Sequence, residues 1–167
     1  EESALPISQW RPKEEDFLQF LVDSLHVYQY FENDLVQHEE FFHRFRNTGL
    51  ERCQALRKDI EWMTRFGHEP GSATDAAIGY VNYLKDLVVL KPESVLCHWY
   101  NYYFAHTAGG RMIGRQVMGR LFGGRKFAFY EWDSDVRVLL AEVRTIIDDV
   151  AKEWSRELKD EIGRAHV

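Results

Sequence analysis

The sequence contains little cysteine, little proline and no long hydrophobic run, and these shortages exclude several classes of protein. Two cysteines and four prolines occur among 167 residues. Cys53 and Cys97 stand apart, without the spacing of metal ligands, which favours free thiols in a reducing compartment over a disulfide. No run of about 18 apolar residues occurs, so we expect no segment that spans a membrane.

The charge balance is mildly acidic. There are 21 Lys and Arg residues against 27 Asp and Glu residues, a net charge of −6. No basic tract recurs along the chain, which disfavours nucleic acid as a partner. Hydrophobic residues make up 45% and aromatic residues 14% of the sequence, as in a folded globular protein. We expect a single domain over residues 1–167, with residues 1–11 forming a linker-like N-terminal segment.

The hydrophobic pattern predicts an all-α fold, because apolar residues recur at spacings of three and four and no strand of consequence is visible. Proline, glycine and the loop sequence GHEPGSAT mark the expected ends of helices. We expect helices from Pro12 past Tyr28, from about Leu50 to Phe66, from Thr74 to Leu90, from Pro92 to Phe122, and from a cap at Asp133 to about Ile162, with an irregular aromatic segment from Phe127 to Trp132.

Two adjacent glycines stand in the middle of the fourth predicted helix. Gly109 and Gly110 have no proline or Asn/Asp turn chemistry beside them. A glycine inside a helix costs about 1 kcal/mol relative to alanine. Two in a row predict a bend in the helix or the close approach of a large flat ligand.

His106 is the polar residue closest to this glycine pair. It stands three residues before Gly109, on the same side of a helix. Two interpretations remain open: a partly buried histidine bonded to a neighbouring carbonyl, or a polar group beside a flat, backbone-lined ligand surface.

The sequence HEEFFH resembles a zinc-binding motif but has a different spacing. His38 and His43 are five residues apart, which places them about 140° apart around a helix, so they cannot share a metal ion as an i, i+4 pair can. We expect a solvated face here and no metal site.

The stretch HWYNYYFAHTAGGRMIG, residues 98–114, resembles the distal helix of haem oxygenases, most closely the plant, algal and cyanobacterial type. Residues 15–35, 47–63 and 129–157 are similar to other helical segments of that family. The resemblance covers nearly the whole chain. It implies an all-α, multi-helix single domain whose distal helix is kinked at the glycines.

The resemblance also implies a reaction and its site. Haem oxygenases use haem as both substrate and cofactor and cleave it to biliverdin, CO and iron, and the plastid type takes electrons from ferredoxin. By motif match, His106, Gly109 and Gly110 would be the catalytic residues, and the two glycines would line the haem with Tyr100 and Arg144, which match contacts to the propionates. The implied location is the plastid, with the protein soluble or peripheral.

One element of the family pattern is missing from these residues. The proximal iron ligand of the family is a histidine on a first helix that precedes the segment near Trp10, and His26 does not match that position. The first hypothesis is therefore a ferredoxin-dependent haem oxygenase whose proximal helix lies outside this chain.

The alternative hypothesis is a non-catalytic structural or regulatory subunit of a larger plastid assembly. In that case, protein partners would cover the apolar faces that the missing helix leaves open. Candidate residues for that surface are Phe17, Phe20, Leu21, Tyr28, Leu140 and Ile147.

Overall fold

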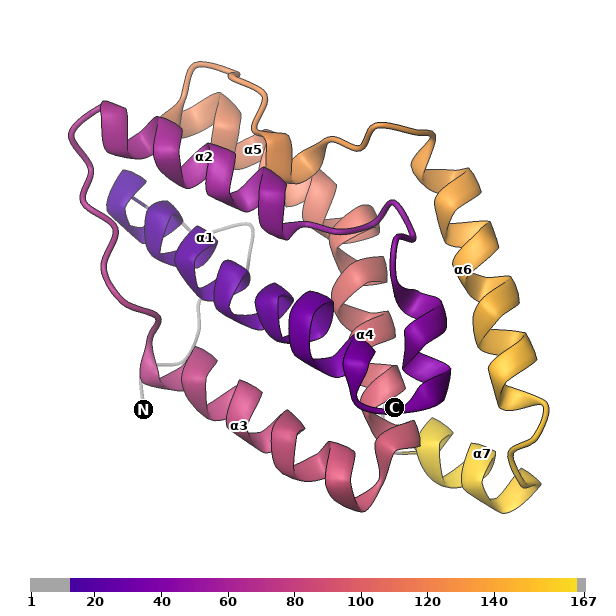
Figure 1. Cartoon of the computed structure of the whole chain (residues 1–167). Coiled ribbons are helices and arrows are strands. Elements are labelled where there is room, and N and C mark those ends of the chain that lie inside the picture. The colour runs from indigo at the N-terminus through magenta and orange to yellow at the C-terminus, as the bar shows by residue number, and fades with distance from the viewer. Residues whose placement is uncertain (1–12, 165–167) are drawn as a thin grey trace.

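The structure is a computed structural model that describes residues 13–164, and over that range it consists of helices and loops without a strand (Figure 1). The predicted all-α fold is confirmed. The predicted linker at residues 1–11 and the expected helix start at Pro12 lie outside the described residues. The main helices are α1 (Glu14–Gln29), α2 (Cys53–Arg65), α3 (Asp75–Leu90), α4 (Pro92–Ala105), α5 (Arg111–Leu121), α6 (Val136–Ala151) and α7 (Arg156–Arg164).

Short helices connect or extend the long ones. π-helical turns lie at Tyr30–Asp34 and His106–Gly110, and 3₁₀ helices lie at Leu35–Gln37, Glu40–Phe45 and Ala128–Tyr130. α1 lies between α2 and α3 and packs against both, and α3 also packs against α4 (Figure 1). α6 packs against the Glu40–Phe45 helix, and α7 contacts α4.

The predicted distortion of the distal helix is confirmed. The helix that begins at Pro92 is interrupted by the π turn His106–Gly110, and its ribbon changes direction between α4 and α5 (Figure 1). It ends at Leu121, and Gly123 and Gly124 follow with φ of 60° and 81°. Left-handed glycines of this kind commonly terminate helices.

The boundaries of α2 and α3 lie close to those predicted. Thr74 caps α3 by accepting a hydrogen bond from the backbone N–H of Ala77 at 3.4 Å. α2 begins at Cys53 rather than Leu50, because the Glu51 carboxylate binds the backbone N–H groups of Thr48 and Gly49 and holds that stretch as a loop.

The prediction for the last helix was wrong in two respects. Its cap is Asp135 rather than Asp133, because the Asp135 side chain accepts the Arg137 N–H at 2.9 Å. The helix also does not run unbroken to Ile162. It ends at Ala151, and α7 starts afresh after Ser155, whose hydroxyl accepts the Leu158 N–H at 3.1 Å and caps the new helix.

The core is rich in aromatic side chains, and it includes residues that we expected on an open face. Phe17, Leu21 and Tyr28 are buried, so their assignment to a partner-covered surface was wrong. The Phe17 ring packs against the rings of Phe122 and Phe127, with centroids 5.5 and 5.3 Å away, so the chain after α5 covers this side of α1. Of the other expected residues, Phe20 is 43% exposed, and Leu140 and Ile147 are half-buried.

Candidate functional site

A largely apolar pocket of about 640 Å³ lies where α1 and α3 face the α4–α5 helix. The π turn forms part of its wall and contributes His106 and Gly110. The structure thus places two of the predicted site residues on one cavity. Other lining residues include Phe20, Ser24, Tyr28, Tyr80, Tyr102, Ala105, Ile113 and Phe129.

His106 is buried, and its ring is held in one orientation. Its Nε2 lies 2.7 Å from the carbonyl oxygen of Phe129, and the two rings stack with centroids 3.9 Å apart and planes 18° apart. A carbonyl oxygen can only accept a hydrogen bond, so Nε2 carries the proton and donates it. The neutral ring therefore has its lone pair on Nδ1. Both interpretations offered for this histidine are compatible with that arrangement: it bonds to a carbonyl, and it lines a pocket.

The surroundings of His106 keep it neutral. Its pKa is lowered from 6.5 to about 4, chiefly by burial and also by the positive charges of Arg52 and Arg111, while the hydrogen bond to Phe129 acts in the opposite direction. At neutral pH, Nδ1 can therefore accept a hydrogen bond but has no proton to donate.

The two predicted glycines serve different purposes. A Cβ atom at Gly110 would lie 3.1 Å from Nδ1 of His106 and 3.4 Å from the Ala105 carbonyl oxygen, so the absence of a side chain there makes room for the histidine ring. A Cβ atom at Gly109 would meet nothing within 4 Å. Gly109 instead faces outward with Ala105 and Ala108, which are also exposed.

This outward surface fits a flat ligand. Ala105, Ala108 and Gly109 expose backbone and methyl groups only, so a planar molecule can approach the helix backbone closely. Met112, one turn further along, is the first long side chain on this side and is 62% exposed. The small residues and the apolar pocket beside them together form an open, largely apolar surface.

Tyr100 and Arg144 are brought together at a separate place. The Tyr100 ring stacks on Phe104 with centroids 4.0 Å apart, and the Arg144 guanidinium lies 5.0 Å from the centroid of the same Phe104 ring. Neither residue lines the pocket. Arg144 is exposed, and no carboxylate among residues 13–164 pairs with it, so it is available to an anionic group.

Two charged residues that the sequence analysis did not select hold the segment behind His106. The Asp59 carboxylate accepts the backbone N–H groups of Ala128 and Phe129 at 2.9 and 2.7 Å. The Arg52 guanidinium lies 3.3, 3.0 and 2.8 Å from the carbonyl oxygens of Ala128, Phe129 and Glu131. Both side chains are buried. The sequence could have indicated these two residues by their spacing. Arg52 stands four residues before Leu56 and Asp59 four residues before Met63, so both charges fall on the otherwise apolar side of the helix.

A third glycine, also not selected, is sterically the most restricted in the helix. A Cβ atom at Gly114 would lie 2.5 Å from the Tyr130 ring, closer than real atoms approach. Gly114 therefore allows α5 to pack directly on the Ala128–Tyr130 helix. No turn motif marks this position, so the sequence carries no signal for it.

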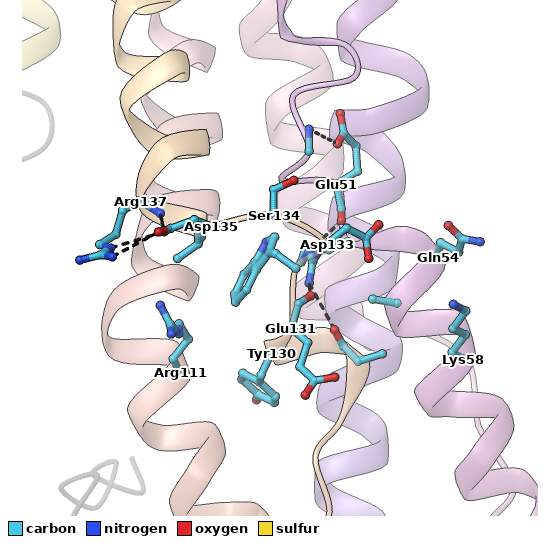
Figure 2. A pocket seen from close by; sticks show the side chains of 16 residues that line it. Glu51, Gln54, Lys58, Arg111, Tyr130, Glu131, Asp133, Ser134, Asp135 and Arg137 are labelled. Atoms are coloured by element: carbon cyan, nitrogen blue, oxygen red, sulfur yellow. Dashed lines mark hydrogen bonds and ion pairs between the residues drawn. The ribbon is translucent and has the colours of Figure 1, made fainter.

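A larger hollow of about 940 Å³ lies among the starts of α2, α5 and α6 and contains none of the predicted site residues. Figure 2 shows Gln54 and Lys58 on one side of it and Arg111 and Arg137 on the other. Ala128 and Tyr130 line this hollow, whereas Phe129 between them lines the apolar pocket. Its larger volume does not make it the candidate functional site, because acidic and basic side chains are mixed along its walls.

Over the described range, residues 13–164, no group of three or more His, Cys, Asp or Glu side chains could hold a metal ion. In the same part of the chain, no helix has both the length and the apolar character needed to cross a bilayer. Nδ1 of His38 lies 3.4 Å from Oε1 of Glu39 near the surface.

Comparisons with known proteins agree with the geometry. A family model described as "Heme oxygenase" matches residues 8–161. "Heme oxygenase 1, chloroplastic" of Arabidopsis thaliana is 43% identical over 157 residues, which cover 93% of this chain and 55% of that protein. The rice protein of the same name is 39% identical over 161 residues, 96% of this chain and 56% of that protein.

A relative with a different printed name is also similar. "Probable inactive heme oxygenase 2, chloroplastic" of rice is 37% identical over 150 residues, 89% of this chain and 46% of that protein. The chain thus spans about half the length of the curated relatives it matches.

Proposed function

Because the chain belongs to the haem oxygenase family, we propose that it forms the distal side of a haem cleft and takes part in the ferredoxin-dependent cleavage of haem to biliverdin, CO and iron. The observation that carries this proposal is the open backbone surface at Gly109 beside the neutral, buried His106. When bound, haem supplies the iron that activates O₂. The protein residues supply orientation, exclusion of water and hydrogen bonding.

Each site residue has a role that follows from its position. Gly109 would let a bound porphyrin approach the helix backbone, which would shield that part of the ring from oxygen attack. His106 presents Nδ1 as an acceptor that can hold a distal water. Tyr100 and Arg144 match the family's propionate contacts and would bind the two propionates, since a guanidinium is well matched to a carboxylate.

The proposal includes a proximal iron ligand from outside these 167 residues. No histidine of this chain matches the family's proximal position, and His26 lies on α1. We therefore expect the isolated chain to bind haem weakly and without the Soret band of a histidine-ligated iron. An absorbance titration with haem tests this. A stoichiometric complex with a histidine-ligated spectrum would show that a residue of this chain is the ligand.

Turnover in the full gene product tests the enzyme itself. With haem, O₂, ferredoxin and ferredoxin reductase, we expect biliverdin to accumulate. Gly109→Leu places a side chain on the proposed haem face and should lower turnover at least tenfold, whereas Gly119→Leu is a matched control on α5, where a Cβ atom also meets nothing within 4 Å. Absence of biliverdin from the wild type, or equal turnover in both variants, would contradict the proposal.

The alternative is a non-catalytic structural or regulatory subunit of a larger plastid assembly. The observation that favours it is the similarity to relatives named as probable inactive, the rice protein above and one from Arabidopsis thaliana that is 34% identical over 152 residues. Native mass spectrometry of material isolated from plastids would separate the two functions. A stoichiometric complex with other subunits and no biliverdin formation supports the subunit; a monomer that turns over haem excludes it.

A further inference from the structure

One backbone carbonyl joins the buried arginine to the pocket histidine. The Phe129 oxygen accepts from Nε2 of His106 at 2.7 Å and from Nη1 of Arg52 at 3.0 Å. A carbonyl oxygen has two lone pairs, so these two donors satisfy it fully. The orientation of the histidine ring is thus tied to a residue at the start of α2.

Arg52 is held tightly where it lies. It is 5% exposed, its guanidinium lies 4.5 Å from the centroid of the Trp132 ring, and Nε donates to the carbonyl oxygens of Leu50 and Glu51 at 3.1 and 2.7 Å. No carboxylate among residues 13–164 forms an ion pair with it. Buried charges are normally paired, so an arginine satisfied by carbonyls alone requires those carbonyls to stay in place.

We propose that Arg52 is a positioning residue for His106. By holding the Phe129 carbonyl, Arg52 keeps His106 in the tautomer with its proton on Nε2, so that the Nδ1 lone pair lies beside Gly110. The pocket then selects a ligand that donates a hydrogen bond at this point, such as water or another O–H group, over one that only accepts. This inference extends the role of His106 in the proposed function. The effect of Arg52 on the tautomer stands independently of that function, and only the effect on catalysis rests on it.

The other groups around His106 are consistent with a neutral ring. Arg111 on α5 is the second cation that opposes its protonation. Tyr28 on α1 and Tyr130 in the Ala128–Tyr130 helix have rings 6.4 and 5.1 Å from the histidine ring. Burial raises the pKa of both tyrosines, so they stay neutral. Within the part of the chain that the structure describes, no anion therefore offsets the two cations beside the histidine ring.

Nitrogen NMR of the histidine rings tests the proposal without haem. The chain has seven histidines, and the signal of His106 is assigned by its loss in His106→Gln. In the wild type we expect a protonated Nε2 and an unprotonated Nδ1 at neutral pH. Arg52→Met should produce a mixture of tautomers and move the midpoint of titration up toward the ordinary histidine value.

Arg111→Met is the matched control, because it removes the second cation near His106 without touching the Phe129 carbonyl. It should raise the midpoint of titration but leave the tautomer unchanged. Arg52→Lys keeps the charge but loses the fork of donors, so it should disturb the tautomer with a smaller change in titration.

Two results would overturn the proposal: a wild-type His106 with its proton on Nδ1, or an unchanged tautomer in folded Arg52→Met or Arg52→Lys. The wild-type spectrum decides the first point even where a variant does not fold. Failure of the haem oxygenase proposal has a separate signature, the absence of biliverdin from the full gene product, and leaves the NMR result unaffected.

Discussion

At the scale of single residues, His106 couples the stability of the fold to pH. Its pKa is about 4 in the folded protein, against the ordinary histidine value of 6.5 that applies to the unfolded chain. Between these values the unfolded chain binds a proton that the folded chain does not. Stability is therefore full above the ordinary value and falls as the pH drops through this window.

We expect this loss to disappear in His106→Gln, whose side chain does not titrate. The full effect of the wild-type histidine is roughly 3 kcal/mol by linkage. Roughly 2 kcal/mol of this is lost between pH 7 and pH 5. Urea unfolding at the two pH values measures it as the difference in pH dependence of the free energy of unfolding between wild type and variant. Parallel pH dependence in the two proteins would mean that His106 titrates normally.

A second residue-scale prediction concerns Gly114. Gly114→Ala should destabilise the protein by about 1–3 kcal/mol through overpacking, even though alanine favours helix, because the new methyl group would stand 2.5 Å from the Tyr130 ring. Gly119→Ala, where nothing lies within 4 Å, should be neutral or stabilising by up to about 1 kcal/mol. Thermal unfolding followed by circular dichroism compares them, and equal melting temperatures would contradict the steric argument.

At the scale of elements, α2 acts as a clamp on residues 127–132. Asp59 binds two of the segment's N–H groups, and Arg52 binds three of its carbonyl oxygens. The start of α2 is itself anchored, because the Glu32 carboxylate accepts the N–H groups of Arg52 and Cys53 and the hydroxyl of Tyr103. These hydrogen bonds therefore hold the segment behind His106 in place, although it is mostly irregular.

Removing the Asp59 carboxylate should loosen this clamp. Asp59→Ala leaves two buried N–H groups unsatisfied and should cost about 2–4 kcal/mol of stability, with faster hydrogen exchange at Ala128 and Phe129. Glu61→Ala is the control on the same helix, because its ion pair with Arg65 is exposed, and it should change stability by less than about 0.5 kcal/mol. Equal losses in both variants would argue against the clamp.

The accuracy of the sequence-based prediction also differs from element to element. α3 could be predicted almost to the residue, because Thr74 and Pro92 are strong local signals. The distortion at Gly109 and Gly110 could be predicted because two adjacent glycines are unfavourable in a helix. The break in the last helix was missed because its only local signal is Ser155, a single serine whose hydroxyl caps α7. The roles of Arg52 and Asp59 depend on a segment that follows them by about 70 residues or more, so local patterns do not reveal them. The role of Gly114 depends on a single contact with the Tyr130 ring.

At the scale of the whole molecule, the core closes without a partner. Phe17, Leu21 and Tyr28 are buried by the chain itself, and the open face at Gly109 consists of small residues whose exposure costs little. The large hydrophobic side chains that are exposed occur on several elements: Phe20 on α1, Phe66 after α2, Ile78, Tyr83, Val89 and Leu90 on α3, Met112 on α5 and Val138 on α6.

We therefore expect the isolated chain to be a folded monomer of 19.8 kDa at micromolar concentration. Size-exclusion chromatography with light scattering measures the mass, and circular dichroism reports the helix content. Soluble oligomers or aggregates at low concentration would show that an apolar face is left open and would favour the subunit alternative.

The π turn has a consequence for the rotational phase of the long helix. A π turn takes up one residue more than an α-turn and leaves the helix beyond it in its original phase. If residues 106–110 were regular α-helix instead, α5 would rotate by about 100° relative to α4, and Gly114 would turn away from Tyr130. The π turn therefore lets the helix contain one additional residue without changing the direction in which α5 faces. A single-residue deletion there would straighten the helix over the pocket while α5 kept its packing on the aromatic segment.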